Sequence, residues 1–83
     1  MNYQSVIVTY NRKDKLIEAL DSLLNQKVQP IRIILIDNHS IDGTEKRLEE
    51  EGLLNNPKIV YIQMPKNYGG SGGFYYGIKE AMK

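Results

Sequence analysis

The sequence has no cysteine and no tryptophan, and it contains a single histidine, His39. Without cysteine there is no disulfide framework and no thiolate-ligated zinc, and one histidine cannot form a histidine metal cluster. The absence of cysteine leaves the redox compartment open, so we take the cytoplasm as the default location. We predict no metal site within these residues.

An excess of charge is also absent, because 11 Lys and Arg balance 10 Asp and Glu, for a net charge of +1. This balance does not provide the strong basic field that nonspecific nucleic-acid binding uses, so we predict no nucleic-acid partner. Long apolar runs are missing too. The first one, Tyr3 to Thr9, is far shorter than the ~20 residues of a membrane span. We therefore expect no targeting or spanning segment, and 83 residues bound the chain to one core.

Three runs rich in β-branched and aromatic residues predict strands. They cover residues 3–9, 31–36 and 59–64. Their starts are separated by 31 − 3 = 28 and 59 − 31 = 28 positions, close to the ~30 residues of a βαβ unit. The continuous apolar stretch within the second run is typical of a strand that is covered on both faces.

Each predicted strand is followed by a helical pattern. The first helix places Leu16, Ile17, Leu20, Leu23 and Leu24 on one face. The second is expected to run from Asp42, as a cap paired with Glu45, to Gly52. The third is expected from about Gly73, with a buried stripe made of Phe74, Gly77, Ile78, Ala81 and Met82.

This βα alternation predicts a parallel sheet with the three connecting loops along its carboxyl edge. The loops are residues 10–13, 38–43 and 65–72. Ligands of open α/β sheets bind at that edge. The first loop contains no glycine, which disfavours a dinucleotide-binding dehydrogenase, and the glycine-rich third loop lacks the lysine of a phosphate-binding P-loop.

Several loop residues have both a structural and a functional interpretation. Asn11 could cap the first helix with Asp14, and Arg12 could be a solvated surface cation or a phosphate contact. Ser40 could serve a cap or a ligand, whereas Asp37, a carboxylate at the end of a buried strand, favours function. The glycines after Asn67 suit an anion at a helix start, or equally a flexible lid or tight turn.

Taken together, four segments resemble glycosyltransferase family 2 of the GT-A fold: Val6–Arg12, Ser22–Gln26, Ile36–Thr44 and Asn67–Gly73. The resemblance covers essentially the whole chain. It implies an α/β, three-layer βαβαβα half of a GT-A, Rossmann-like nucleotide-diphospho-sugar transferase fold with a parallel sheet. The glycine-rich third loop is most similar to the rhamnosyl- and galactofuranosyltransferase-like branch.

The resemblance also implies a nucleotide-binding role for particular residues. These are Thr9, Tyr10, Asn11, Arg12, Asp37, Asn38, Ser40, Asn67, Gly69 and Gly70. The implied activity is inverting transfer of a sugar from a UDP- or dTDP-sugar to a glycan or lipid-linked acceptor. The third loop departs from the family pattern, since Gly73-Phe74-Tyr75 stands in place of Ala-Arg-Asn, and the roles of that Arg and Asn are not carried over.

The family's Asp-x-Asp metal motif and its catalytic base have no counterpart in this sequence. We therefore expect residues 1–83 to be one N-terminal nucleotide-binding portion of a glycosyltransferase domain, truncated before the metal motif and inactive alone. The divalent metal, Mg or Mn, is expected for the full enzyme and not for this part. The longer protein would be cytoplasmic or peripheral at the inner face of a membrane.

Two other classes remain open at this point. The first is a noncatalytic nucleotide-binding or regulatory α/β module, and the second is a flavodoxin-like or receiver-type domain, which fits less well because acids are missing after the first and third strands. A three-stranded sheet with an uncovered edge and an apolar helix stripe also predicts marginal stability or self-association.

Overall fold

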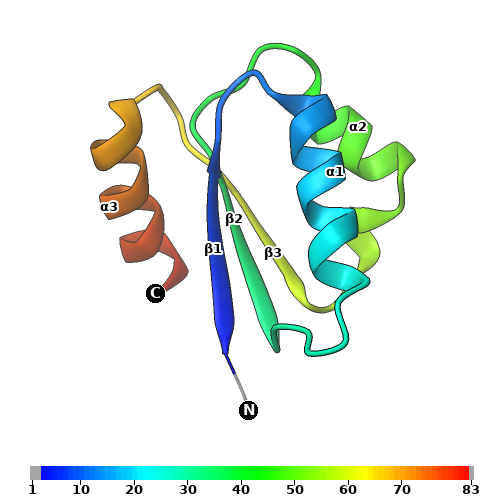
Figure 1. Cartoon of the computed structure of the whole chain (residues 1–83). Coiled ribbons are helices and arrows are strands. Elements are labelled where there is room, and N and C mark those ends of the chain that lie inside the picture. The colour runs from blue at the N-terminus through cyan, green and yellow to red at the C-terminus, as the bar shows by residue number, and fades with distance from the viewer. Residues whose placement is uncertain (1–2, 83) are drawn as a thin grey trace.

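The computed structural model describes residues 3–82, in which three parallel strands lie between helices (Figure 1). The element order is β1 (Gln4–Thr9), α1 (Lys13–Leu24), β2 (Arg32–Asp37), α2 (Thr44–Glu50), the short 3-10 helix η1 (Leu53–Asn55), β3 (Ile59–Gln63) and α3 (Gly69–Ala81). The strand order is β1-β2-β3, with Gln4 opposite Arg32 and Ile33 opposite Ile59. The three predicted strands are therefore confirmed, with ends that differ by one residue.

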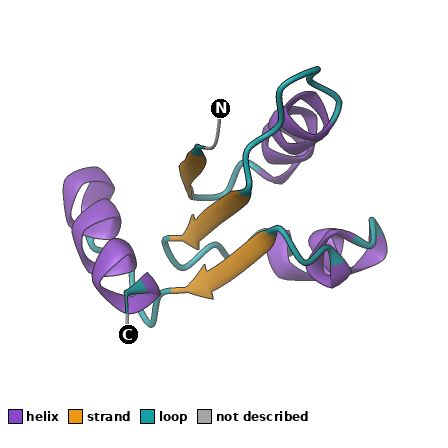
Figure 2. Cartoon of the chain, turned by 90° about the horizontal axis from the view of Figure 1, so that it is seen from below, coloured by secondary structure: helices purple, strands orange, loops and turns teal. Residues whose placement is uncertain are grey.

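Seen from below, α1 and α2 cover one face of the sheet and α3 covers the other (Figure 2). Successive side chains of β2 point to opposite faces, so Ile33 and Leu35 pack with the α1 residues Leu16, Ile17 and Leu20, together with Leu48 of α2. Ile34 and Ile36 pack on the other side, with Met64, Ile78 and Ala81. Every residue from Ile33 to Asp37 is buried, and the three-layer α/β prediction is confirmed.

The start of α3 lies at Gly69, whereas the sequence predicted about Gly73. Glycine is a poor helix former, but here two glycines let the helix approach the sheet. A Cβ at Gly77 would lie 2.6 Å from Cγ1 and Cγ2 of Ile36, and one at Gly73 would lie 2.9 Å from Nδ2 of Asn38. Close contact between α3 and β2 thus overrides the low helix propensity.

The predicted apolar stripe of α3 is correct for Gly77, Ile78 and Ala81 but wrong at its two ends. Phe74 is 50% exposed and Met82 is 81% exposed. The face turned to the sheet runs through Gly73 and Gly77, and Gly73 was not part of the predicted stripe. Among residues 3–82, no helix combines the length and apolar character needed to cross a membrane.

The start of α2 also differs from the prediction. Its N-cap is Gly43, with φ of 85°, and no side chain caps it, so Asp42 and Glu45 do not form a capping box. The helix ends before Gly52, whose φ of 75° lies in the left-handed region that favours glycine. The predicted end of α2 is therefore confirmed, while Asp42 has a different partner.

Candidate functional site

The carboxyl ends of the three strands lie side by side, because Thr9, Asp37 and Gln63 are register partners across the sheet. The loops that follow β1, β2 and β3 therefore gather along one edge. We call them loop 1 (residues 10–12), loop 2 (residues 38–43) and loop 3 (residues 64–68). This is the edge at which the sequence predicted a ligand.

Loop 1 is fastened to loop 2 by Asn11. Its backbone N–H donates to Oγ of Ser40 (3.0 Å), and its Oδ1 accepts from the backbone N–H of Ile41 (2.8 Å). Asn11 has φ of 51°, a left-handed conformation that asparagine tolerates better than most residues. The alternative of Asn11 as a cap of α1 with Asp14 is wrong, since the N-cap is Arg12 and no side chain caps that helix locally.

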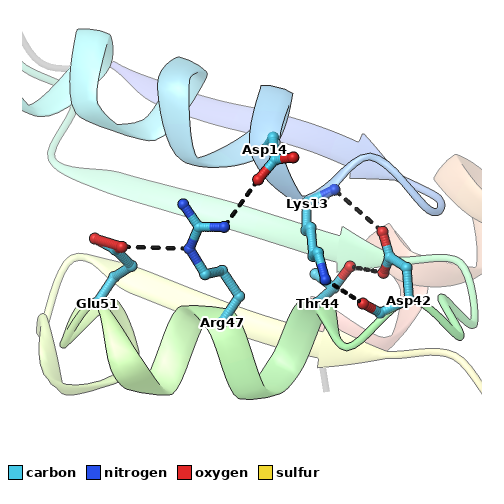
Figure 3. A network of polar contacts seen from close by, with 6 residues as sticks. All are labelled: Lys13, Asp14, Asp42, Thr44, Arg47 and Glu51. Atoms are coloured by element: carbon cyan, nitrogen blue, oxygen red, sulfur yellow. Dashed lines mark hydrogen bonds and ion pairs between the residues drawn. The ribbon is translucent and has the colours of Figure 1, made fainter.

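The start of α1 is instead held by Asp42 of loop 2 (Figure 3). Oδ2 of Asp42 accepts from the backbone N–H of Lys13 (3.2 Å), its Oδ1 accepts from the Thr44 hydroxyl, and its carbonyl accepts from Nζ of Lys13 (2.9 Å). Burial alone would raise the pKa of Asp42, but the hydrogen bonds from Thr44 and Lys13 hold it below its usual value.

A second tie between α1 and α2 lies farther along the same helices in Figure 3. Arg47 contacts Asp14 of α1 at 2.8 Å and Glu51 at 3.3 Å. Both carboxylates raise the pKa of Arg47 above its usual value. These exposed ion pairs are worth little individually, and the pair with Asp14 links α2 to α1.

Asp37 is buried, with 1% of its surface exposed, and both carboxylate oxygens have donors within the chain. Oδ1 accepts from the backbone N–H of Ser40 (2.8 Å), and Oδ2 accepts from the hydroxyl of Tyr61 in β3 (2.6 Å). Burial, followed by the hydrogen bond to Asp37, raises the pKa of Tyr61 above its usual value. Asp37 thus shapes loop 2 through internal contacts.

Asn38 connects loop 2 to loop 3. Its Nδ2 donates to Oδ1 of Asn67 (2.9 Å) and to the carbonyl of Gly69 (2.9 Å), while its Oδ1 accepts from the backbone N–H of Tyr68 (2.9 Å). Oδ1 of Asn67 also accepts from the backbone N–H of Gly69 (2.7 Å). The turn that leads into α3 is therefore organised around one buried amide.

A depression of about 340 Å³ opens between loop 1 and loop 3. It is lined by Val8, Thr9, Tyr10, Arg12, Asn38, Asn67 and Gly69. Apart from Val8, every lining residue belongs to the set that the sequence singled out for nucleotide binding. Tyr10 and Arg12 are exposed, and within residues 3–82 the Arg12 side chain has no hydrogen bond or ion pair.

A second depression of about 540 Å³ lies beside the first and is built mainly from the first turn of α1. Asn11 and Arg12 line it, with Lys13, Asp14, Lys15 and Asp42. Because it brings only loop 1 and Asp42 together, it collects fewer of the predicted residues than the smaller depression. Arg12 lines both, so its guanidinium can reach either space.

The remaining predicted residues lie elsewhere. Asp37 and Ser40 line neither depression, and Gly70 lies within α3, with surroundings outside what the structure describes. His39 has its Nδ1 3.3 Å from the Met64 carbonyl, and among residues 3–82 no three His, Asp or Glu side chains gather as a metal site.

Tyr61 and Gly73, which support the site from behind, were not predicted as site residues. A tyrosine in the middle of an otherwise aliphatic strand was the available signal for Tyr61, since a buried hydroxyl needs a partner.

Comparisons with known proteins point in one direction. The model of the family described as "Glycosyl transferase family 2" matches residues 5–83. The galactofuranosyltransferase GlfT1 of Mycobacterium tuberculosis is 34% identical over 79 residues, which are 94% of this chain and 25% of that protein. No solved structure gives a significant match.

Two further relatives are similar over almost the same region. The uncharacterized glycosyltransferase YwdF of Bacillus subtilis is 35% identical over 81 residues, 98% of this chain and 29% of that protein. The abequosyltransferase RfbV of Salmonella typhimurium is 36% identical over 77 residues, 90% of this chain and 23% of that protein. The chain thus spans about a quarter of the length of the curated relatives it matches.

Proposed function

Because the chain belongs to glycosyltransferase family 2, we propose that the depression between loop 1 and loop 3 holds the nucleotide of a nucleotide-sugar donor. One observation carries the proposal: the depression lies at the carboxyl edge of the parallel sheet and is lined by Thr9, Tyr10, Arg12, Asn38, Asn67 and Gly69. That edge is where open α/β sheets bind ligands.

The lining residues suggest how such a donor is gripped. The Tyr10 ring is half exposed and offers a face on which a base can stack. The guanidinium of Arg12 has a fork of N–H donors that suits diphosphate oxygens and, in the described residues, no competing carboxylate partner. Asp37 and Ser40, which the family resemblance implied as nucleotide-binding residues, line neither depression, and we propose that they shape loop 2 beneath this site.

For the complete enzyme we propose inverting transfer from a UDP- or dTDP-sugar to a glycan or lipid-linked acceptor, at or near a membrane. The acceptor hydroxyl attacks the anomeric carbon, the bond from that carbon to the diphosphate breaks, and the nucleoside diphosphate leaves. A base takes the hydroxyl proton. We propose galactofuranose as the transferred sugar, because the relative GlfT1 is named as a galactofuranosyltransferase.

A divalent metal ion would supply charge neutralisation at the diphosphate of the complete enzyme. The residues described here do not fit such an ion, because no three acidic or histidine side chains gather and both oxygens of Asp37 already accept hydrogen bonds. We therefore propose that the metal and the catalytic base of the complete enzyme are supplied by residues other than the described residues 3–82.

Titration calorimetry of UDP, dTDP and GDP against the 83-residue chain tests the proposal. We expect a preference for UDP or dTDP, and no heat of binding from any of the three would contradict it. Arg12→Ala should weaken binding by roughly 10- to 150-fold, the value of a charge-assisted hydrogen bond of about 1.5–3 kcal/mol.

Arg32→Ala is the matched control. Arg32 is an exposed arginine at the opposite end of β2, where its guanidinium donates, among residues 3–82, only to Oε1 of Gln4. Arg32→Ala changes the net charge by the same amount as Arg12→Ala. Equal loss of binding in the two variants would therefore assign the effect to overall charge and not to the site.

A further inference from the structure

The side-chain amide of Asn38 is fully used inside the chain, and only 3% of the residue is exposed. Both Nδ2 hydrogens have acceptors, on Asn67 and Gly69, and Oδ1 has a donor, the backbone N–H of Tyr68. Nδ2 faces two acceptors and Oδ1 faces one donor, so this pattern fixes which end of the amide is which. No hydrogen is left for a ligand.

Gly73 blocks the other side of the same amide. A Cβ at position 73 would lie 2.9 Å from Nδ2 and 3.0 Å from Cγ of Asn38, closer than side-chain atoms pack. The amide is therefore held between α3 on one side and the turn of loop 3 on the other. Hydrogen bonds on one side and the bare backbone of α3 on the other give it one orientation.

The partners of this amide form the wall of the depression. Asn67 and Gly69 line it directly. Gly69 has φ of 78°, and two hydrogen bonds support this conformation: its carbonyl accepts from Nδ2 of Asn38, and its N–H donates to Oδ1 of Asn67. Loop 1 is linked to the same point, because the backbone N–H of Asn38 donates to the Thr9 carbonyl (2.9 Å). Asn38 thus makes hydrogen bonds to both walls of the depression.

We infer that Asn38 is a positioning residue, which holds the Asn67–Gly69 turn in the shape that receives the nucleotide and does not contact the nucleotide itself. The inference rests on the proposed function, and it reassigns a residue that the sequence predicted as a ligand contact. It also gives Gly73 a role, that of leaving room for the amide. The two N–H donors are the essential part, and a carboxylate of the same shape cannot supply them.

Asn38→Asp tests the inference, since it keeps the shape and replaces both donors with an acceptor facing two oxygens. We expect nucleotide binding to weaken by roughly tenfold or more. Amide hydrogen exchange by NMR should accelerate at Tyr68 and Gly69, while the amide of Met64, directly after β3 and bonded to the Asp37 carbonyl, keeps its protection. A residue that only stabilises the fold would not produce this local pattern.

The outcomes separate the two proposals. If the unmodified chain binds no nucleotide, the proposed function fails. If it binds and Asn38→Asp binds equally well, the positioning role is overturned, and it is likewise overturned if exchange rises evenly along the chain. Asn55→Asp, the same chemical change at an exposed residue of η1, should leave binding and exchange unaltered.

Asn67→Ala provides a second variant should Asn38→Asp fail to fold. Asn67 is exposed, so its truncation leaves the core intact, but it removes one acceptor of the Asn38 amide and the acceptor of the Gly69 N–H. We expect faster exchange at Gly69 and weaker nucleotide binding. Normal exchange at Gly69 in this variant would contradict the arrangement.

Discussion

At the scale of single residues, Asp37 shows how a charge is kept inside a small core. Burying an ionised carboxylate without partners costs several kcal/mol, and here a backbone N–H from loop 2 and the Tyr61 hydroxyl supply the two donors. The hydroxyl comes from β3, so the shape of loop 2 depends on a strand that is separated from it in the chain by α2 and η1.

Removing that hydroxyl should destabilise the fold. Tyr61→Phe keeps the ring in the core and leaves Oδ2 of Asp37 without its donor, which typically costs about 1–3 kcal/mol. Urea denaturation measures the change in the free energy of unfolding. Tyr75→Phe is the control, because Tyr75 is exposed and its hydroxyl makes no hydrogen bond among the contacts of residues 3–82; an equal loss in both variants would contradict the role of the Asp37 contact.

The same variant has a pH dependence whose sign follows from the raised pKa of Tyr61. A group with a higher pKa in the folded state contributes its full stability below its unfolded value, about 10 for tyrosine. That contribution is lost as the pH rises through the folded pKa. The stability difference between the unmodified chain and Tyr61→Phe should therefore be constant below about pH 10 and shrink above it.

Long-range polar contacts of this kind could not be predicted from the sequence. Asn11 is of a residue type that often caps helices, and only the fold shows that it bonds to Ser40 and Ile41 instead. Asp42 likewise sits where a cap of α2 belongs but satisfies the first turn of α1. Local sequence patterns identify side chains that can accept a hydrogen bond from a backbone N–H. The packing of the helices decides which N–H donates it.

At the scale of elements, α3 packs close to the sheet because Gly73 and Gly77 have no side chains to keep it away. Gly77→Ala should force α3 away from Ile36. Overpacking costs about 1–3 kcal/mol, and the gain in helix propensity of ~1 kcal/mol offsets only part of it. Ser71→Ala, at an exposed position of the same helix, should instead be neutral or slightly stabilising.

Calorimetric melting temperatures of both variants check this prediction. A Gly77→Ala variant as stable as Ser71→Ala would mean that α3 does not pack as closely on β2 as the structure describes.

The elements themselves were largely predictable. Strands β1, β2 and β3 follow from β-branched runs at regular spacing, and α1 follows from its leucine and isoleucine periodicity. The start of α3 was not, because a run of glycines indicates a turn unless a neighbouring surface rewards close approach. Phe74 was wrongly placed in the core, because a search for apolar side chains selects Phe74 and passes over the buried neighbour Gly73.

At the scale of the whole molecule, apolar groups remain at the surface. Phe74, Tyr75 and Met82 are exposed on α3, and the groove of about 360 Å³ between them is also lined by Ile78 and Lys79. Within the described residues, β1 and β3 each pair on one side only, with β2. Unpaired edges and exposed apolar groups favour association.

We therefore expect the 83-residue chain to associate in a concentration-dependent way in sedimentation velocity. Phe74→Ser should reduce association if the α3 surface carries it, whereas association through the strand edges would be unchanged by this substitution. A monodisperse monomer at all concentrations, with a cooperative melting transition, would contradict the expectation.

The central position of β2 has a consequence for how the chain folds. Both ladders of the sheet include β2, and they join residues 28 positions apart, as in Gln4 with Arg32, or 26 apart, as in Ile33 with Ile59. Each pairing must therefore close a loop that contains a helix before any ladder bond forms, at an entropic cost that local helix contacts alone do not repay. Neither strand pairing can form without β2, so we expect β1 and β3 to join the sheet, and to leave it on unfolding, in a single cooperative step.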